Sequence, residues 1–176
     1  GTVYISTETG DQPGALVARD AVSGEEQWRF ETDSSIRSSP QVVDTTAFVI
    51  AVGDALYAID TADGTEQWRS TDVRVNTDSS PTVTDERVFI TGRELYVVDT
   101  VTGDTRWRFG TEGRATTTPT VAEETVFVAF RSDVSEADEV SFNSTLYAVD
   151  TSDGTEKWQF ELGDRSPSDP TVANGL

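Results

Sequence analysis

The chain has 176 residues and a formal net charge of −19, from 32 acidic and 13 basic residues. It contains no cysteine and no histidine, which excludes disulfides, thiolate nucleophiles, imidazole bases and metal sites built from Cys or His. Nucleic acid is disfavoured as a partner, because phosphate binding needs a basic face. No apolar run approaches the roughly 18 residues of a membrane span, so we expect no membrane-spanning helix in this sequence.

The predicted elements are short β-strands along the whole chain. Residues 1–32 hold three of them, "TVYIST", "ALVARD" and "EQWRF", without an opening strand. Residues 33–72 hold a full set of four: "PQVVD", "AFVIAV", "ALYAID" and "EQWRS". Residues 73–112 and 113–163 repeat this set, and residues 164–176 hold a lone opening strand in "DPTVANGL". The segments are β-branched and aromatic and are bounded by turn residues, which is typical of strands. We therefore expect 16 strands.

Each unit carries the motif Asp-x3-Gly-x3-Trp around the turn between its last two strands. The Asp carboxylate is suited to accept backbone N–H bonds in the turn, and Gly supplies the positive φ at its end. The Trp places a large ring against the neighbouring unit. The motif residues are Asp20, Gly24, Trp28, Asp60, Gly64, Trp68, Asp99, Gly103, Trp107, Asp150, Gly154 and Trp158. Successive Trp residues lie 40, 39 and 51 positions apart, and a period near 40 indicates a propeller or a solenoid.

The acidic residues are spread along the chain, and Lys157 is its only lysine. The repeated aromatic and β-branched residues argue against disorder and predict a folded protein with a carboxylate-covered surface. This charge balance resembles that of proteins from salt-accumulating, halophilic archaea. We therefore expect folding to require salt, since dissolved ions screen the repulsion between like charges. The chain begins at Gly1 and lacks methionine, from which we expect a processed or excised piece.

The stretch "LYAIDTADGTEQWRS", with the preceding "SSPQVVDTTAFVIAVGD", resembles the repeat of the pyrroloquinoline-quinone-type (PQQ-like) β-propellers. The resemblance covers nearly the whole chain. It implies an all-β fold of four-stranded antiparallel blades, with about four blades' worth of strands in one domain over residues 1–176. Blade 1 is partial over 1–32, blades 2, 3 and 4 occupy 33–72, 73–112 and 113–163, and 164–176 opens or closes another blade.

Three architectures agree with this strand count. The chain is a piece of a larger seven- or eight-bladed ring, or two copies join into an eight-bladed ring, or the last strand closes a four-bladed ring. The family's shallow rotation between blades disfavours the tight four-bladed closure. We favour a piece of a larger ring, with the pair of copies second.

The connections into the opening strands each contain one arginine: Arg37, Arg74, Arg114 and Arg165. One interpretation is charge pairing with nearby Asp and Glu. The functional interpretation is an anion-binding rim near the channel mouth, for a carboxylated ligand such as the quinone.

Two longer segments between second and third strands are expected as loops on one face of the propeller. They are "TETGDQPGA" in blade 1 and the acidic "RSDVSEADEVSFNST" in blade 4. Long loops on one face suggest a recognition surface for a protein partner, and solvated loops are the alternative. Asn143-Ser144-Thr145 also matches a glycosylation acceptor at Asn143.

Three functions follow as hypotheses. The first is a non-catalytic binding or scaffold propeller, extracellular or at the cell surface, without a cofactor or metal. The second is part of a PQQ-dependent dehydrogenase. The resemblance implies that such an enzyme stacks PQQ between a tunnel Trp and a vicinal Cys pair and holds calcium with acidic and amide groups. No residue is carried over, because the chain has no Cys and the motif accounts for all four Trp. The third hypothesis is a structural spacer without a ligand.

Overall fold

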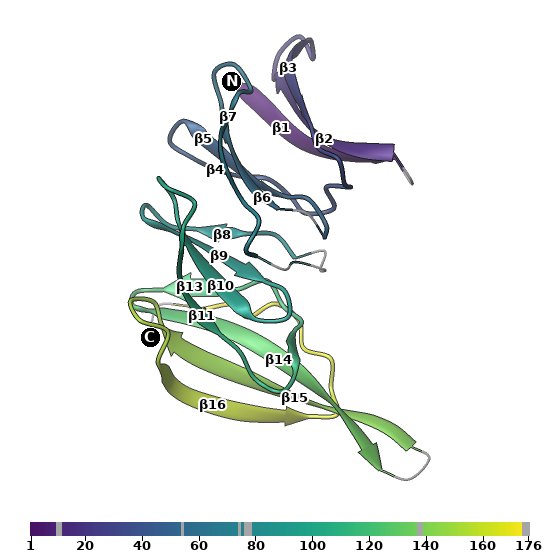
Figure 1. The fold of residues 1–176 in the computed structure, drawn as a ribbon, viewed down its shortest axis with the longest axis vertical. Helices are drawn as coiled ribbons and strands as arrows, with labels where there is room; N and C mark the ends of the chain where they lie inside the picture. The colour runs from purple at the N-terminus through teal and green to yellow at the C-terminus, as the bar shows by residue number, and fades with distance from the viewer. Residues whose placement is uncertain (10–11, 54, 74, 76–78, 137–138, 174–176) are drawn as a thin grey trace.

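The protein is all-β in a computed structural model that describes residues 1–9, 12–53, 55–73, 75, 79–136 and 139–173. These residues form four antiparallel sheets and include no helix long and apolar enough to cross a membrane. Figure 1 shows the sheets following one another along an arc, with the first sheet at one end and the fourth at the other. This arrangement agrees with successive blades of a propeller.

Each sheet is built from strands that are consecutive in sequence. The first contains β1 (Thr2–Thr9), β2 (Gln12–Asp20) and β3 (Glu26–Glu31). The second contains β4 (Gln41–Val43), β5 (Thr46–Ile50), β6 (Leu56–Asp60) and β7 (Glu66–Ser70). The third contains β8 (Thr82–Val83), β9 (Arg87–Thr91), β10 (Leu95–Asp99) and β11 (Thr105–Phe109). The fourth contains β12 (Arg114–Ala115), β13 (Thr120–Ala122), β14 (Thr125–Glu136), β15 (Glu139–Asp150) and β16 (Glu156–Gly163).

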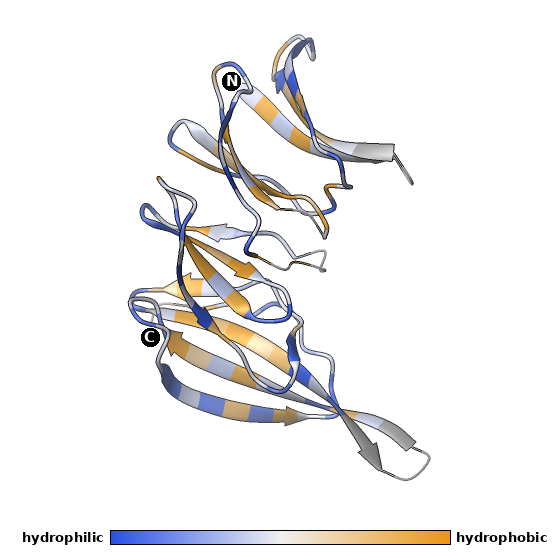
Figure 2. Cartoon of the chain, in the orientation of Figure 1, coloured by the Kyte–Doolittle hydropathy of each residue, from blue (hydrophilic) through white to orange (hydrophobic). Residues whose placement is uncertain are grey.

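The central strands of the second and third blades are buried on both faces. All of β6 except its last residue is buried, and β10 has the same pattern. Such strands are continuous apolar runs rather than alternating ones, and Figure 2 shows hydrophobic residues along β9, β10 and β14. The outer strand β7 instead alternates between partly buried and exposed positions. The two faces of each inner blade are therefore covered by its neighbours.

The Asp-x3-Gly turns have the same geometry in all four blades. Asp99 Oδ1 accepts hydrogen bonds from the N–H groups of Val101 and Thr102, at 2.8 and 2.9 Å. Gly103 ends that turn with a φ of 76°, and the corresponding glycines of the other blades have φ between 74° and 79°. A positive φ is unfavourable for any residue with a Cβ, so the turn requires the glycine.

The motif tryptophans join one blade to the next. The Trp28 indole donates a hydrogen bond of 3.0 Å from Nε1 to Thr61 O, in the turn of the second blade. A Cβ added at Gly64 would lie 2.7 Å from the same ring. Trp68 and Trp107 make equivalent bonds of 3.1 Å into the turns of the third and fourth blades. Each turn is thus also the docking site for the Trp of the preceding blade.

The fourth tryptophan has no such partner among the described residues. The side chain of Trp158 is 45% exposed and that of Phe160, on the same strand, is 61% exposed. Trp158 contacts the ring of Phe127 in its own blade, with the centroids 5.7 Å apart. The face of the fourth blade that looks away from the third blade is therefore open.

The expected opening strand over residues 164–176 is corrected by the structure. Residues 164–173 form no strand, and residues 174–176 lie outside the described part. Pro170 O nevertheless accepts a hydrogen bond of 2.6 Å from Thr120 Oγ1, as Pro119 O does from Thr82 Oγ1. The segment thus lies where an opening strand would begin. In the other blades the opening strand pairs with the second strand of the same blade. The described residues include no second strand with which residues 164–173 could pair. The sixteenth strand is instead β12.

The two expected loops are also corrected, because both are β-hairpins. Strands β14 and β15 pair without interruption from Thr125↔Asp150 to Glu136↔Glu139. The "RSDVSEADEVSFNST" segment is therefore a hairpin arm that continues the blade, and Figure 1 shows it projecting beyond the fourth sheet. In the first blade, β1 and β2 pair as far as Thr9↔Gln12. In the fourth blade the register extends into the insertion without a shift, whereas in the first blade it shifts between Thr7 and Thr9.

Candidate anion-binding site

Of the four arginines expected at the rim, the three that the structure describes do not line one hollow. Arg37 lines a hollow between the first two blades, and Arg114 lines a different one between the third and fourth. Arg165 is exposed and belongs to neither of these hollows. Arg74 lies outside the described residues. Among the three described arginines, Arg114 shares its hollow with other cations, Arg93 and Arg131, and the lining of the hollow at Arg37 includes no second cation.

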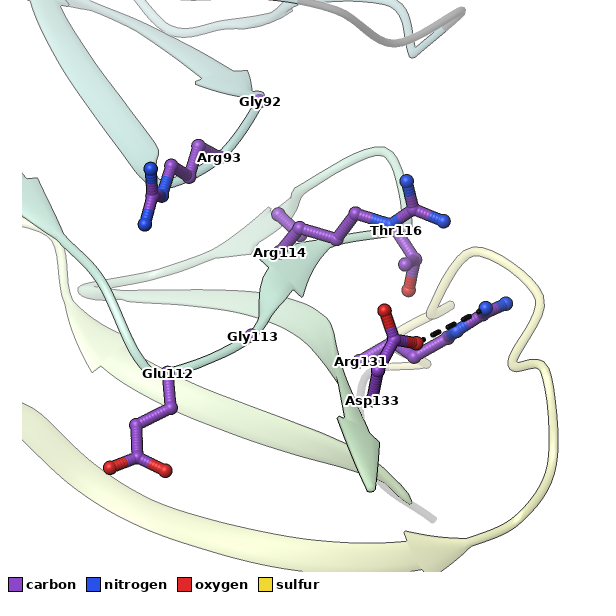
Figure 3. A pocket seen from close by; sticks show the side chains of 9 residues that line it. Gly92, Arg93, Glu112, Gly113, Arg114, Thr116, Arg131 and Asp133 are labelled. Carbon is purple, nitrogen blue, oxygen red and sulfur yellow. Dashed lines mark hydrogen bonds and ion pairs between the residues drawn. The ribbon is translucent and has the colours of Figure 1, made fainter. Parts of the chain in front are cut away.

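The hollow around Arg114 has a volume of about 600 Å³. The turn between β9 and β10 forms one wall and carries Arg93. The connection into the fourth blade and the start of the hairpin arm form the others. The lining residues are Gly92, Arg93, Glu112, Gly113, Arg114, Ala115, Thr116, Arg131 and Asp133, and we call this the arginine pocket (Figure 3).

Strand pairing brings two of the arginines together. Arg114 on β12 and Arg131 on β14 are direct cross-strand partners, so their side chains leave the same face of the sheet. The backbone approaches closely just before this pair, where a Cβ at Gly113 would lie 2.4 Å from Arg131 O. Like charges placed directly opposite in an antiparallel pair are unfavourable. An anion between the two guanidinium groups would relieve this repulsion.

Contacts on either side of its guanidinium group hold Arg131 in place. Its Cζ lies 4.3 Å from the centroid of the Phe142 ring, a cation–π contact within the hairpin arm. Its Nη2 donates a hydrogen bond of 3.4 Å to Asp133 Oδ1, and Figure 3 shows these two side chains adjacent. Its Nε is buried without a hydrogen-bond partner among the described residues. The guanidinium is therefore positioned but incompletely satisfied by the chain.

The charge balance of the pocket is opposite to that of the whole chain. Its lining has three arginines against the two carboxylates of Glu112 and Asp133, whereas the chain has a net charge of −19. Within the described part of the chain, neither Arg93 nor Arg114 has a carboxylate within ion-pair distance. Glu112 points away from Arg114 and Arg131 in Figure 3. Planar guanidinium groups bind carboxylate and phosphate groups with paired hydrogen bonds.

Sequence reasoning missed Arg93 and Arg131. Arg93 lies in the turn between the second and third strands of its blade, and Arg131 lies on β14, the second strand of the next blade. Arg131 was taken for part of an acidic loop, and Arg93 occupies a turn of three residues between β9 and β10. The sequence signal that could have found them is their position in the repeat. Arg93 and Arg131 follow the start of a second strand, and they line the same hollow as Arg114 in the connection between blades.

Asn143 lies within β15, opposite Ser132, and is partly buried. Its Oδ1 is buried and has no hydrogen-bond partner among the described residues. Glycosylated asparagines lie on the surface, so the position is poorly suited to carry a glycan. Modification of Asn143 stays a prediction.

The turn aspartates Asp99 and Asp150 accept hydrogen bonds that stabilise their turns. The backbone N–H of Thr102, the guanidinium of Arg106 and the N–H of Val101 together lower the pKa of Asp99 to about 2. Hydrogen bonds from Ser152 and Lys157 hold the pKa of Asp150 far below its usual range. A carboxylate with so low a pKa is a poor general base at neutral pH. These residues stabilise turns and are not suited to acid–base catalysis.

The residues present do not fit bound PQQ with calcium. The described part of the chain contains no group of three or more acidic side chains arranged to hold a metal ion. Trp28, Trp68 and Trp107 are held against the turns of neighbouring blades, so none of these three lies free to stack on a quinone. Trp158 is 45% exposed, but it lies on the outer strand β16 against Phe127. The sequence has no Cys to supply the other side of such a stack.

Comparison with known proteins agrees with the propeller fold. The chain is similar to the structure of BamB from Moraxella catarrhalis, with 20% identity, a TM-score of 0.63, and coverage of 93% of this chain and 62% of that one. It is also similar to a europium-containing methanol dehydrogenase, with 12% identity, a TM-score of 0.74, and coverage of 93% and 40%. The computationally designed Ika8 protein matches with 12% identity, a TM-score of 0.72, and coverage of 95% and 52%.

Identities this low show the fold alone, and the chain spans less than two thirds of each of these structures. No curated protein matches the chain. A family model does match: the PQQ-type repeat model described as outer membrane protein assembly factor BamB aligns with residues 1–90 and 74–176, which together cover the sequence. The chain therefore belongs to the BamB-like family of PQQ-type repeat β-propellers.

Proposed function

We propose that the chain is a non-catalytic binding domain that receives a carboxylate group of a partner protein in its arginine pocket. The observation that carries this proposal is that Arg93, Arg114 and Arg131 line one hollow in a chain with only 13 basic residues. Arg114 and Arg131 lie opposite each other on paired strands, and Asp133 is the one carboxylate that pairs with Arg131 among the described residues. A carboxylate between the two arginines would accept hydrogen bonds from both.

The surroundings favour a protein over a polyanion as the partner. The hairpin arm begins at the pocket, which its residues Arg131 and Asp133 line, and its sequence is acidic. These acids would repel a nucleic acid or another dense polyanion. A folded partner avoids this repulsion if it presents a single carboxylate to the pocket and neutral or basic groups to the arm.

A calorimetric titration tests this proposal. The ligand is the peptide acetyl-Gly-Asp-Asp-Gly-amide, and acetyl-Gly-Asn-Asn-Gly-amide is its uncharged counterpart. We expect the Asp peptide to bind wild type and to lose at least about tenfold in affinity with Arg114→Gln or Arg131→Gln, since a charge-assisted hydrogen bond contributes about 1.5–3 kcal/mol. Arg108→Gln, on an outer strand, is the control and should leave affinity unchanged.

Equal affinity for the two peptides would refute recognition of a carboxylate. So would a loss of affinity in Arg108→Gln as large as that in Arg114→Gln or Arg131→Gln. A complete lack of binding to wild type would instead support the spacer hypothesis, in which the propeller has no ligand. The peptide is a minimal probe, so the test addresses the pocket alone and does not require the partner.

The location of the protein is part of the same proposal. We place it at the cell surface or in the cell envelope of an organism that lives in concentrated salt. The acidic composition supports the salt-rich setting. The family description, outer membrane protein assembly factor, supports an envelope location.

The second candidate, part of a PQQ-dependent dehydrogenase, is favoured by the similarity to methanol dehydrogenase. The residue evidence weighs against it, since three of the four tryptophans are occupied between blades and no acidic metal cluster occurs among the described residues. Likeness of fold does not by itself assign a function.

A further inference from the structure

The hairpin arm leaves the fourth sheet as a ribbon of two strands. On one side, β12 pairs with β14 as far as Arg114↔Arg131. On the other side, β16 pairs with β15 as far as Ser144. Beyond these positions, β14 and β15 pair only with each other in the described part of the chain, out to Glu136↔Glu139, and Figure 1 shows this ribbon projecting from the sheet. Two-stranded ribbons are marginally stable in water by themselves, so a third strand would stabilise the arm.

The backbone groups along one edge of the arm point to the side on which β12 lies. Ala129 O accepts a hydrogen bond of 2.9 Å from the N–H of Thr116, in the segment that continues β12. Backbone groups alternate between the two sides of a strand, so those of Arg131, Asp133 and Ser135 face the same side as those of Ala129. Strand β12 covers this side as far as Arg131. No described strand covers it at Asp133 and Ser135, which leaves a row of unpaired donors and acceptors of the kind that an added strand can pair with.

This open edge begins at the arginine pocket. Asp133 is its first position and also lines the pocket. Strand β12 runs antiparallel to β14, so it runs from the arm toward the blade and begins at Arg114. A strand added antiparallel to the same edge would run in the same direction and end where β12 begins. Its last residue would then lie beside Arg114 and Arg131 (Figure 3).

We propose that the arginine pocket captures the free C-terminus of a partner protein, whose last residues add to the β14 edge of the arm as an antiparallel strand. This rests on the proposed function, because the carboxylate that the pocket receives is here the one at the end of the main chain. Strand addition supplies affinity through main-chain hydrogen bonds, and capture of the terminal carboxylate fixes the register. One ligand thus pairs the open edge and neutralises the facing arginines.

Charge on the arm decides which strand can add to it. The arm carries Asp133, Glu136 and Glu139 in its sequence. Two identical arms paired edge to edge would bring like charges together, which is unfavourable across a pair of strands, so a second copy of this chain is disfavoured. A partner segment with basic or neutral side chains before its C-terminus is favoured.

Calorimetry in molar KCl tests capture of the terminal carboxylate. The probe is the peptide acetyl-Lys-Thr-Lys-Thr-Val with a free C-terminus, and the same peptide with a C-terminal amide is its uncharged counterpart. The free acid should bind at least about tenfold more tightly than the amide, since hydrogen bonds to a charged group are the strong ones. Arg114→Gln should remove this preference, and the control Arg108→Gln should keep it.

A pair of proline variants tests strand addition. Ser135→Pro removes one backbone N–H from the β14 edge. Val140 lies opposite Ser135 on β15, and its N–H faces the other edge of the arm, so Val140→Pro is the matched control. Proline is tolerated on an edge where its nitrogen faces away from the paired strand. Ser135→Pro should weaken binding of the free acid about threefold to tenfold, the effect of one hydrogen bond, and Val140→Pro should leave it unchanged.

Methylation of the peptide asks the same question without a change to the protein. Two peptides are each N-methylated at one position, the last residue or the residue before it. Successive N–H groups of a strand face opposite sides. One methylation should therefore weaken binding about threefold or more, and the other should not.

The outcomes separate this inference from the proposed function. Equal affinity for the acid and the amide, or equal effects of the two methylations, would overturn capture of an added strand. Binding of the internal Asp peptide without binding of the free acid would overturn it as well and leave the proposed function standing. Absence of binding for both peptides would overturn both.

Discussion

At the residue scale, a single tryptophan and a single glycine connect each pair of blades. The indole ring lies flat on the glycine, and the ring nitrogen donates to the carbonyl oxygen of the residue that follows the turn aspartate. The glycine therefore has two requirements at once. Its φ must be positive, and no side chain may occupy the space that the ring fills.

These two requirements can be separated by comparing Gly64→Ala with Gly163→Ala. Both glycines have a positive φ, at 76° and 73°, so each substitution should cost about 1–2 kcal/mol of backbone strain. Only Gly64 lies against a ring, 2.7 Å from the Trp28 atoms. Overpacking there should add about 1–3 kcal/mol. Urea unfolding in molar KCl measures the difference, and equal losses for both variants would show that the ring contact is unimportant.

At the element scale, the sequence predicts the regular blades well because their signals are local. Alternation in β7, apolar runs in β6 and β10, and the Asp-x3-Gly turns each arise from neighbouring residues. The hairpin arm was missed because its polar, acidic composition is typical of loops. Its strands form since β14 and β15 enter the insertion already paired, and such tertiary context overrides intrinsic strand preference.

The difference between local sequence signals and contacts from distant segments also explains where else the structure departs from the prediction. Residues 164–173 have a strand-like sequence but no strand beside them to pair with, so composition alone could not decide their structure. The arginine pocket depends on β12 pairing with β14 and on the β9–β10 turn of another blade. Such contacts between distant segments leave no local pattern.

At the scale of the whole molecule, charge sets the conditions for folding. Salt should raise the melting temperature, because the repulsion within a chain of net charge −19 is screened over about 10 Å at 0.1 M and about 3 Å at 1 M. We expect an increase on the order of 10 °C between these KCl concentrations, as a few kcal/mol shift the melting temperature by this much in a domain of this size. Sucrose at matched osmolality is the control. An unchanged melting temperature in KCl would exclude the salt requirement.

The claim that this propeller binds a partner without performing quinone chemistry is tested most directly by tryptophan fluorescence. Wild type would be titrated with PQQ in molar KCl, with and without calcium, and corrected for absorption by the quinone. We predict no saturable, calcium-dependent quenching, because Trp28, Trp68 and Trp107 are held between blades and the described residues include no acidic metal cluster. Saturable quenching at micromolar PQQ that depends on calcium would contradict the account and restore the dehydrogenase hypothesis.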